Sequence, residues 1–355
     1  MAIIIVVVIV IAGVSGGLGV YFTTQKPAAP APAPALEPTP PPVEELKVLF
    51  ATAQPANNFW CMHQVTLARI SLNNYADVHG VNIDYREAYD IKPSDAPYIL
   101  KQFADDGYKL QILTEGLAPL MEQLGEENPD TEFLCVYYPP PYTTPNVGGY
   151  NDRNDQSYYL AGMLAGMMTE TNKIGYVAAF DIPASAYKYH AFLLGVETVN
   201  PDAEVIYTFT NDGNDVSKGA TAANTLIGMG ADIITGYGNS MMEGAVVESA
   251  RQGVYSIAYI ADLSYMSPDY IAGSVYWNAG TFYERVIQDY RTTGTSGKWY
   301  DLSIDEGGQD LVLNQNLVES GVITSDMISQ IDQAKQALAS GDITGWPAYG
   351  VVTFN

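Results

Sequence analysis

Short apolar runs alternate with longer amphipathic segments from residue 47 to residue 265, and this alternation constrains the fold more than any other feature of the chain. Runs such as "LKVLFATA" and "KIGYVAAF" have the length and composition of buried strands. Segments such as "FWCMHQVTLARISLNNYADVHG" have the length of helices and end at a glycine. Strands separated by helices of this size predict parallel sheets in an α/β fold.

The pattern begins twice, which predicts two lobes in a chain of 355 residues. We expect the first lobe over residues 47–170, the second over 173–265, and a crossover and C-terminal segment over 266–355. Part of residues 277–355 is expected to return to the first lobe. Ligands of open α/β sheets bind beyond the carboxyl ends of the strands. Two Rossmann-like lobes joined by a hinge therefore predict a cleft that closes on a small ligand.

The amino terminus is expected to lie outside this fold. An uncharged apolar run of about 20 residues, Ile3 to Phe22, is long enough to span a bilayer. Residues 1–22 are therefore expected to be a transmembrane anchor, or a signal that is cleaved. Residues 23–46 are rich in Pro and Ala, which favours an extended spacer. We expect the binding domain on the extracytoplasmic face of the cell membrane, or secreted if the terminus is cleaved.

The charge and the cysteine count exclude several classes of protein. The net charge of −24 comes from 16 basic against 40 acidic residues, which argues against binding nucleic acid. Two cysteines, Cys61 and Cys135, make neither a disulfide framework nor a zinc set. They can form one bridge, or pack as two small buried hydrophobic residues. His63, His79 and His190 lack the spacing of metal ligands, so we expect no metal and no cofactor.

Several motifs of the chain resemble the basic membrane protein family of ABC-transporter substrate-binding proteins. They are "YLAGMLAG", "NKIGYVAAFDIP", "AFLLGVETVNPDAEV", "DVSKGATAANTLIGMGAD" and "YWN", and the resemblance runs from about residue 48 to about residue 345. It implies the type I periplasmic-binding fold and a receptor that is not an enzyme. It also implies ABC permease and ATPase subunits as partners, and a purine nucleoside or nucleobase as ligand.

The stretch "PANNFWCMHQ" after the first predicted strand supplies the first candidate ligand residues. A flat heteroaromatic ring needs a face to stack on and polar groups at its edge. Phe59 or Trp60 can supply the face, and because successive helix residues diverge by about 100°, we expect only one of them to line the cleft. His63 lies one helical turn past Phe59. Asn57 and Asn58 can cap the helix or bind the ligand.

The other candidates follow later predicted strands or the return crossing. Arg153 can bind a ring acceptor or form a salt bridge between lobes. Asp215 can accept from the ligand or cap a helix, and Asp262 can accept from ribose hydroxyls or a base N–H. Trp277 offers a second stacking face. The full set outside the first strand's exit is Tyr150, Arg153, Gln156, Asp215, Asn239, Ser240, Asp262, Trp277 and Asn278.

Two departures from the resembled family bear on the ligand. The branch that has an aromatic residue at the position of Phe59 and a histidine at the position of His63 usually has Gly-Trp where this chain has Asn58-Phe59. An acidic residue is usual at the position of Gln156. The alternatives to a purine receptor are a receptor for another small solute such as a sugar, a surface sensor without a transporter, and an enzyme acting on nucleosides. No nucleophile with a base and an orienting acid is visible in the sequence, so we do not expect an enzyme.

Overall fold

The computed structural model describes residues 44–345 and residue 354. The predicted anchor, residues 1–22, and the linker up to residue 43 lie outside the described residues, so both stay predictions. None of the helices in the described part of the chain combines the length and apolar character needed to cross a bilayer. Residues 43–355 form one compact unit that contains two sheets.

The first sheet is parallel throughout and has the strand order β11-β5-β4-β3-β1-β2. Alternate residues of its central strands enter different cores: Val48 and Phe50 pack with α1 and α8, while Leu49 and Ala51 pack with α2 and α3. The sheet is therefore covered on both faces, as is usual for parallel strands. The elements are β1 (Glu45–Ala51), α1 (Phe59–His79), β2 (Asn82–Ala88), α2 (Ala96–Asp105), β3 (Leu110–Leu113), η1 (Glu115–Leu120), α3 (Met121–Glu127), β4 (Glu132–Val136), β5 (Val147–Asn151), α8 (Ala279–Thr292) and β11 (Trp299–Asp301).

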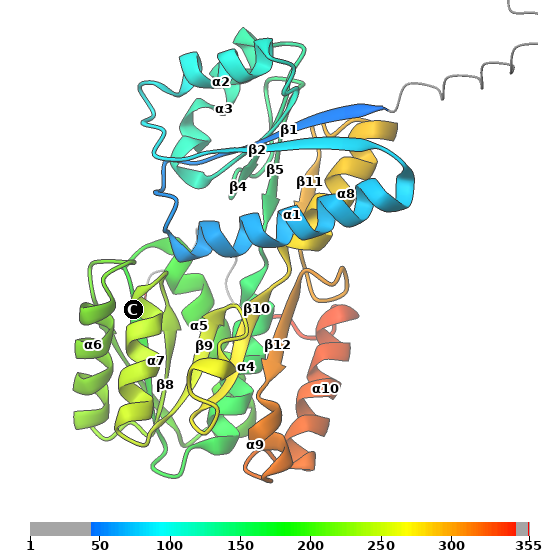
Figure 1. The fold of residues 1–355 in the computed structure, drawn as a ribbon. Helices are drawn as coiled ribbons and strands as arrows, with labels where there is room; N and C mark the ends of the chain where they lie inside the picture. The colour runs from blue at the N-terminus through cyan, green and yellow to red at the C-terminus, as the bar shows by residue number, and fades with distance from the viewer. Residues whose placement is uncertain (1–43, 346–353, 355) are drawn as a thin grey trace, which may run out of the picture. The chain divides into compact units, whose positions relative to one another are not determined.

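The second sheet has the order β12-β10-β9-β8-β6-β7, and only β12 runs antiparallel to its neighbour. Figure 1 shows helices on both sides of it, with α6 and α7 at one flank and α10 at the other. The elements are α4 (Asn154–Met168), β6 (Lys173–Ala178), α5 (Pro183–Val199), β7 (Glu204–Phe209), α6 (Val216–Gly228), β8 (Ile233–Tyr237), α7 (Met241–Arg251), β9 (Tyr255–Ile260), η2 (Ser264–Met266), β10 (Ile271–Trp277), β12 (Gln309–Leu313), α9 (Gln315–Glu319) and α10 (Ser325–Ala339). Two lobes built on parallel sheets confirm the predicted fold class.

The chain passes between the two sheets three times. The first crossover is residues 152–153, between β5 and α4. The second is Asn278, between β10 and α8, and the third is residues 302–308, between β11 and β12. The sequence analysis placed α4 in the first lobe, whereas the structure packs α4 against α5, β10 and β12 of the second. A movement of one lobe against the other would have to bend these three segments.

Helices α4 and α5 pack as closely as two helices can, because glycines meet at their crossing. A Cβ atom on Gly162 would lie 2.0 Å from the carbonyl oxygen of Phe192, and one on Gly195 would lie 2.0 Å from that of Tyr159. The glycines of "YLAGMLAG" thus face the backbone of α5. This contact fixes α5, and with it the side chains at its amino end.

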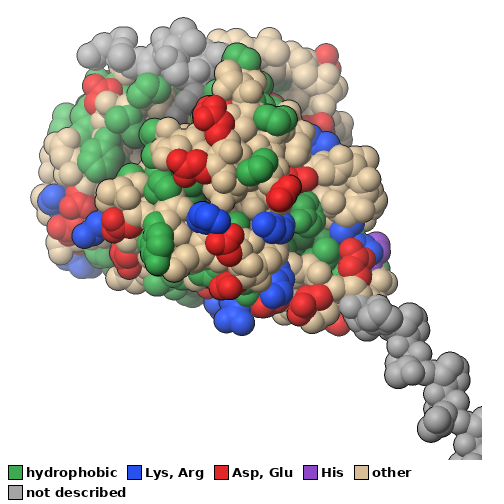
Figure 2. All heavy atoms as spheres, turned by 90° about the horizontal axis from the view of Figure 1, so that it is seen from above, with side chains coloured by type: hydrophobic (Ala, Val, Ile, Leu, Met, Phe, Trp, Pro, Cys, Tyr) green, Lys and Arg blue, Asp and Glu red, His purple; other side chains and the backbone are tan. Residues whose placement is uncertain are grey.

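Acidic and basic side chains are mixed on the face of the molecule seen from above, where Figure 2 shows Lys and Arg next to Asp and Glu. Arg69 pairs with Glu87 at 2.6 Å and Arg86 with Asp84 at 2.9 Å. Exposed pairs of this kind contribute little to stability. They do neutralise part of the field that the acidic excess would otherwise create.

Both cysteines are buried and carry free thiols. The Cys61 sulfur lies 3.8 Å from the Thr52 hydroxyl, and the Cys135 sulfur lies 3.2 Å from the Thr114 carbonyl oxygen. Burial raises the pKa of the Cys61 thiol to about 12, against a small lowering from Thr52. The sequence left open a disulfide bridge or two small buried hydrophobic residues. In the structure, Cys61 and Cys135 are buried, unbridged and pack as hydrophobic residues.

Candidate functional site

A buried cation lies where the strand ends of the two lobes meet. Lys188, near the amino end of α5, donates to the Tyr137 hydroxyl at 3.1 Å and lies 4.0 Å from the Asp152 carboxylate. Tyr137 donates to Asp152 at 2.5 Å, and Asn154 donates to the same carboxylate oxygen at 2.7 Å. The Lys188 ammonium also lies 4.1 Å from the ring centroid of Tyr237. We call these five residues the Lys188 cluster.

The Lys188 cluster draws its members from both lobes and from the segment between them. Tyr137 follows β4 of the first sheet, Tyr237 ends β8 of the second, and Asp152 is in the first crossover. The side chains of Lys188 and Asp152 are fully buried. Burying two charges costs desolvation free energy that their mutual attraction does not always recover. A gain in folding stability is therefore a weak explanation for this buried pair. A buried pair of charges at the strand ends is therefore a candidate functional site.

The members of the cluster differ in their access to solvent. Tyr137 and Tyr237 are partly exposed residues, whereas Lys188 and Asp152 are fully buried. Burial raises the pKa of the Tyr137 phenol well above its ordinary value, and the nearby Asp152 carboxylate raises it further. Tyr137 therefore stays protonated. Its hydroxyl is held between an ammonium donor and a carboxylate acceptor, and a phenol fixed in this way presents its ring in one orientation.

Glu115, the first residue of η1, adds an acidic side chain. The residue is exposed, but desolvation of its carboxyl group by the surrounding protein raises the pKa of that group above the ordinary value. The charge of Lys188 lowers this pKa, and the charge of Asp152 raises it. A carboxylate can accept hydrogen bonds from a bound solute.

The lobes also touch through the loops that follow β1 and β7. Asn58 caps α1 by accepting from the Cys61 amide at 3.1 Å. Its side-chain amide donates to Asn214 of the second lobe, again at 3.1 Å. The caps predicted at Asn58 and Asp215 are both present, since Asp215 accepts from the Ser217 amide at 2.9 Å. Asn57 is exposed.

The predicted aromatic candidates lie at the second crossover. Trp60 stacks on Trp277 with ring centroids 5.1 Å apart, and both side chains are buried. Phe59 is half-buried and packs against both the main core and a small cluster of the second lobe that contains Val246 and Leu263. The His63 ring nitrogen Nε2 lies 2.7 Å from the Trp277 carbonyl oxygen. Burial lowers the pKa of His63, and this hydrogen bond opposes that shift.

Three candidates, in β5, the first crossover and the first turn of α4, are engaged within the protein. Tyr150 is fully buried and accepts from the Gln64 amide at 3.1 Å. Arg153 pairs with Asp155 at 3.1 Å, and Gln156 accepts from the Ile304 amide at 2.8 Å. Tyr150 thus lies in the core of the first lobe, and Gln156 ties the start of α4 to the third crossover.

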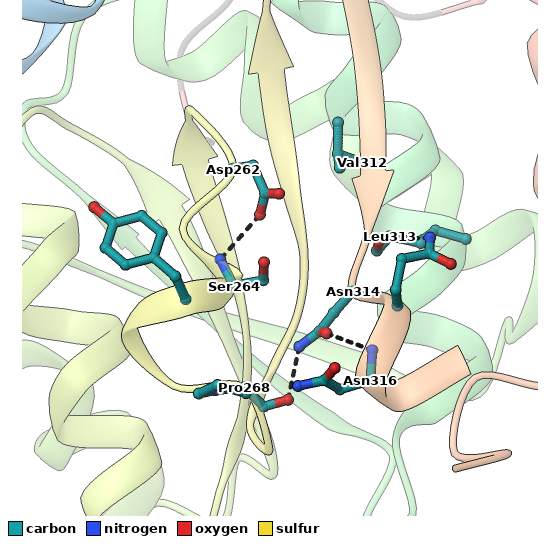
Figure 3. A pocket seen from close by; sticks show the side chains of 9 residues that line it. Asp262, Ser264, Pro268, Val312, Leu313, Asn314 and Asn316 are labelled. Carbon is teal, nitrogen blue, oxygen red and sulfur yellow. Dashed lines mark hydrogen bonds between the residues drawn. The ribbon is translucent and has the colours of Figure 1, made fainter. Parts of the chain in front are cut away.

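The candidates of the second lobe are spread over a wider area. Asn239 and Ser240 follow β8, close to Tyr237 in sequence and partly exposed. Asp262 is exposed and lines a side pocket of about 230 Å³ instead of the Lys188 cluster. In Figure 3 its carboxylate accepts from the Ser264 amide, a 3.0 Å contact, with Asn314 across the pocket. Asn278 donates to the Gly307 carbonyl oxygen at 3.2 Å.

Sequence reasoning did not select the members of the Lys188 cluster or Glu115. Lys188 is the one lysine or arginine in the apolar segment "ASAYKYHAFLLG". A lone cation among apolar residues could have indicated a buried functional lysine. Asp152 follows β5, a strand that the sequence analysis did not predict. Within the described residues, no group of three His, Cys, Asp or Glu side chains is placed to hold a metal ion.

The fold, together with a family model that matches most of the chain, defines a two-lobed solute-binding protein. The chain belongs to the basic membrane protein (Bmp) family, described as ABC transporter substrate-binding protein PnrA-like, whose model matches residues 68–340. The resemblance read from the sequence is thereby confirmed. The members of this family are solute-binding proteins of ABC transporters.

Relatives of the chain differ in their named ligands. It is 26% identical over 306 residues to a purine-binding protein of Brucella abortus, covering 84% of this chain and 83% of that one. It is 32% identical over 218 residues to a putative ABC transporter glucose-binding protein of Haloferax volcanii. That match covers 61% of this chain and only about half, 53%, of the relative. A solute-binding protein of Aeropyrum pernix has the same fold, with a TM-score of 0.69, 21% identity, and coverage of 85% of this chain and 94% of that one.

Proposed function

We propose that the chain is the extracytoplasmic receptor of an ABC importer and that it binds a purine nucleoside or nucleobase between its lobes. The Lys188 cluster is the observation that carries this proposal. It places aromatic rings and hydrogen-bonding groups from both lobes at the carboxyl ends of the strands, where ligands of such sheets bind. The ligand class is supported by the purine-binding relative of Brucella abortus, which aligns over most of both chains.

The chemistry of the site suits a flat ring with donors and acceptors at its edge. Tyr137 and Tyr237 are partly exposed aromatic residues on which a flat ring could stack. Glu115 offers an acceptor for a ring N–H or a ribose hydroxyl. Lys188 and Asp152 are fully buried and hold the Tyr137 hydroxyl in place, so the site is preorganised. A permease and an ATPase would then receive the solute, as the family implies.

A sugar receptor is the second candidate, because the relative of Haloferax volcanii is named for glucose. Aromatic faces with carboxylate and amide groups bind pyranoses as well as purines. One titration separates the candidates: isothermal calorimetry with adenosine, guanosine, adenine, xanthine and D-glucose. We expect saturable binding of at least one purine. Binding of glucose but of no purine, with the glucose binding lost in Tyr237→Leu, would replace the purine proposal with the sugar receptor. Release of free base, detected by chromatography, would indicate an enzyme.

A substitution tests whether the solute occupies the Lys188 cluster. Tyr237→Leu removes a ring face and should weaken purine binding by about 1–3 kcal/mol, or roughly 5- to 150-fold, if the base stacks there. Tyr265→Leu is the matched control, because Tyr265 is in η2 of the same lobe, lines the side pocket and is 73% exposed. Calorimetry on the three proteins measures both effects. Equal affinity in all three would place the solute elsewhere.

A further inference from the structure

A second pocket lies beside the hinge, on the edge of the second sheet that is formed by β12. It has a volume of about 330 Å³, within the usual range for small-molecule sites. The side pocket of about 230 Å³ shares Val312 with it, so the two continue one another along β12. Figure 1 shows β12 beside α10, which supplies one wall. The lining residues are Tyr276, Asn278, Ile304, Gly307, Gln309, Asp310, Val312 and Lys335. We call this the hinge pocket.

The walls of the hinge pocket combine apolar surface with one neutralised pair of charges. Tyr276 is half-buried, and Ile304 and Val312 are aliphatic. Asp310 and Lys335 form an ion pair at 2.6 Å, and both side chains remain partly exposed. Because the two charges cancel, the pocket attracts neither a cation nor an anion over distance. It still offers an acceptor and a donor side by side.

These features select a class of ligand. Two neighbouring hydroxyl groups can donate to the Asp310 carboxylate and accept from the Lys335 ammonium at once. The C–H face of a saturated ring can pack on Tyr276 and Val312. We propose that the hinge pocket is a second binding site, for a neutral cyclic polyol such as an inositol or a pyranose.

The position of the pocket gives this site contact with the hinge. Asn278 belongs to the second crossover, and Ile304 and Gly307 to the third. Gln309 donates to the carbonyl oxygen of Asp152 in the first crossover. Its side-chain oxygen also accepts from the Ser157 hydroxyl at 3.0 Å. A molecule in the pocket therefore touches the segments that bend when the lobes move, and its binding depends on their arrangement.

Calorimetric titration of the full chain with myo-inositol, and separately with D-glucose, tests the site. We expect saturable binding of at least one of them by the wild type. Val312→Trp fills the pocket and should weaken this binding at least tenfold. Lys335→Met keeps the aliphatic stem but removes the donor, and should have an effect of the same size. Because Lys335 is on a surface helix, this variant tests the proposal even if Val312→Trp does not fold.

Two controls separate this site from the Lys188 cluster. Val247→Trp makes the same substitution at an exposed position of α7 and should leave polyol binding unchanged. Tyr237→Leu should also leave it unchanged, whereas it weakens solute binding at the cluster. The proposal is overturned if neither probe binds saturably at millimolar concentration. It is equally overturned if Tyr237→Leu abolishes polyol binding while Val312→Trp and Lys335→Met do not. A failure of purine binding leaves these outcomes unaffected.

Discussion

Glu122, in the first turn of α3, holds the loop between β4 and β5. Its carboxylate accepts from the Thr143 hydroxyl at 2.6 Å, the Thr144 amide at 2.7 Å and the Tyr138 hydroxyl at 2.6 Å. Partial burial alone would raise the pKa of Glu122, but these hydrogen bonds outweigh it and lower the pKa to about 2. The loop that follows β4 and carries Tyr137 at its start is thus secured by a single carboxylate.

The stability supplied by Glu122 should depend on pH in a defined direction. The pKa of Glu122 is lower in the folded chain than in the unfolded chain, where a Glu side chain has a pKa of about 4.3. The contribution is therefore complete above that pH and is lost as the pH falls towards about 2. We expect Glu122→Gln to lower the free energy of unfolding by about 1–3 kcal/mol at pH 6, and by roughly half as much at pH 3. Urea unfolding at both pH values measures this.

A control for this prediction lies on the same helix. Glu127 is exposed and accepts one hydrogen bond from the Gln123 amide, at 2.9 Å. Glu127→Gln should change the free energy of unfolding by less than about 0.5 kcal/mol at either pH. An effect of Glu122→Gln that stays constant between pH 6 and pH 3 would contradict the charged hydrogen bonds as its cause.

At the residue scale, polar residues near the lobe boundary could be located in the sequence because they follow predicted strands. Asn58 and His63 are examples: Asn58 contacts Asn214 of the second lobe, and His63 contacts the Trp277 carbonyl oxygen at the end of β10. This approach does not work for Lys188, because a lysine on a helix normally extends into solvent. The burial of Lys188 depends on Tyr137 and Asp152, which come from other parts of the chain. Such a cluster is a product of tertiary structure and has no local pattern.

At the element scale, the crossing of α4 and α5 gives the clearest prediction. Gly162→Ala would place a Cβ atom 2.0 Å from a backbone oxygen of α5, and a backbone cannot move aside as a flexible side chain can. We expect it to lower the free energy of unfolding by about 3 kcal/mol. Gly228→Ala, at the end of α6 with no atom within 4 Å of the added carbon, should leave it unchanged or raise it by up to about 1 kcal/mol. Thermal and urea unfolding compare the two. Equal free energies of unfolding for the two variants would mean that α4 and α5 can move apart to accommodate the added Cβ atom without loss of stability.

Strand β5 shows why some elements could not be predicted. Its sequence "VGGYN" contains two glycines, which disfavour a strand. The structure needs both: a Cβ atom on Gly149 would lie 2.0 Å from the Tyr138 carbonyl oxygen, and one on Gly148 would lie 2.6 Å from that of Lys298. The backbone of neighbouring segments approaches from outside the strand. Local propensity is overruled here by contacts that are distant in sequence.

At the scale of the whole molecule, the hydrogen bond between Asn58 and Asn214 links the lobes far from the crossovers in sequence. Under the proposed receptor function, it helps to hold the lobes together on the solute. Asn214→Ala should weaken solute binding about 2- to 10-fold, which corresponds to about 0.5–1.5 kcal/mol, through faster dissociation. Stopped-flow kinetics measures the rate, and the radius of gyration from X-ray scattering should increase in the solute-free variant.

The matched control for the contact between lobes lies within the second lobe. Asn224 accepts from the Gln252 amide at 2.9 Å, and both residues are on outer helices. Asn224→Ala should leave the dissociation rate and the radius of gyration unchanged. A dissociation rate for Asn214→Ala equal to that of the wild type would show that the lobes do not depend on this hydrogen bond.

The two-lobe architecture was predictable from the sequence because the βα alternation is long and begins twice. Residues 295–355 were not resolved into elements in advance. Strand β11 has only three residues, and β12 runs against the direction of its sheet. Neither has the signature of a βα unit, since each joins a sheet whose other strands come from earlier in the chain.

The three crossovers have a consequence for synthesis on the ribosome. The first sheet is completed by β11, which begins at Trp299, and the second by β12, which begins at Gln309. Each sheet lacks its last strand until most of the 355 residues have been translated. Neither half of the chain can therefore finish folding while the other is being made, unlike domains that are continuous in sequence and fold one after another from the amino terminus. The nascent chain therefore exposes unpaired sheet edges until these last strands have been translated. During that time a chaperone or an export machinery can bind the incompletely folded chain.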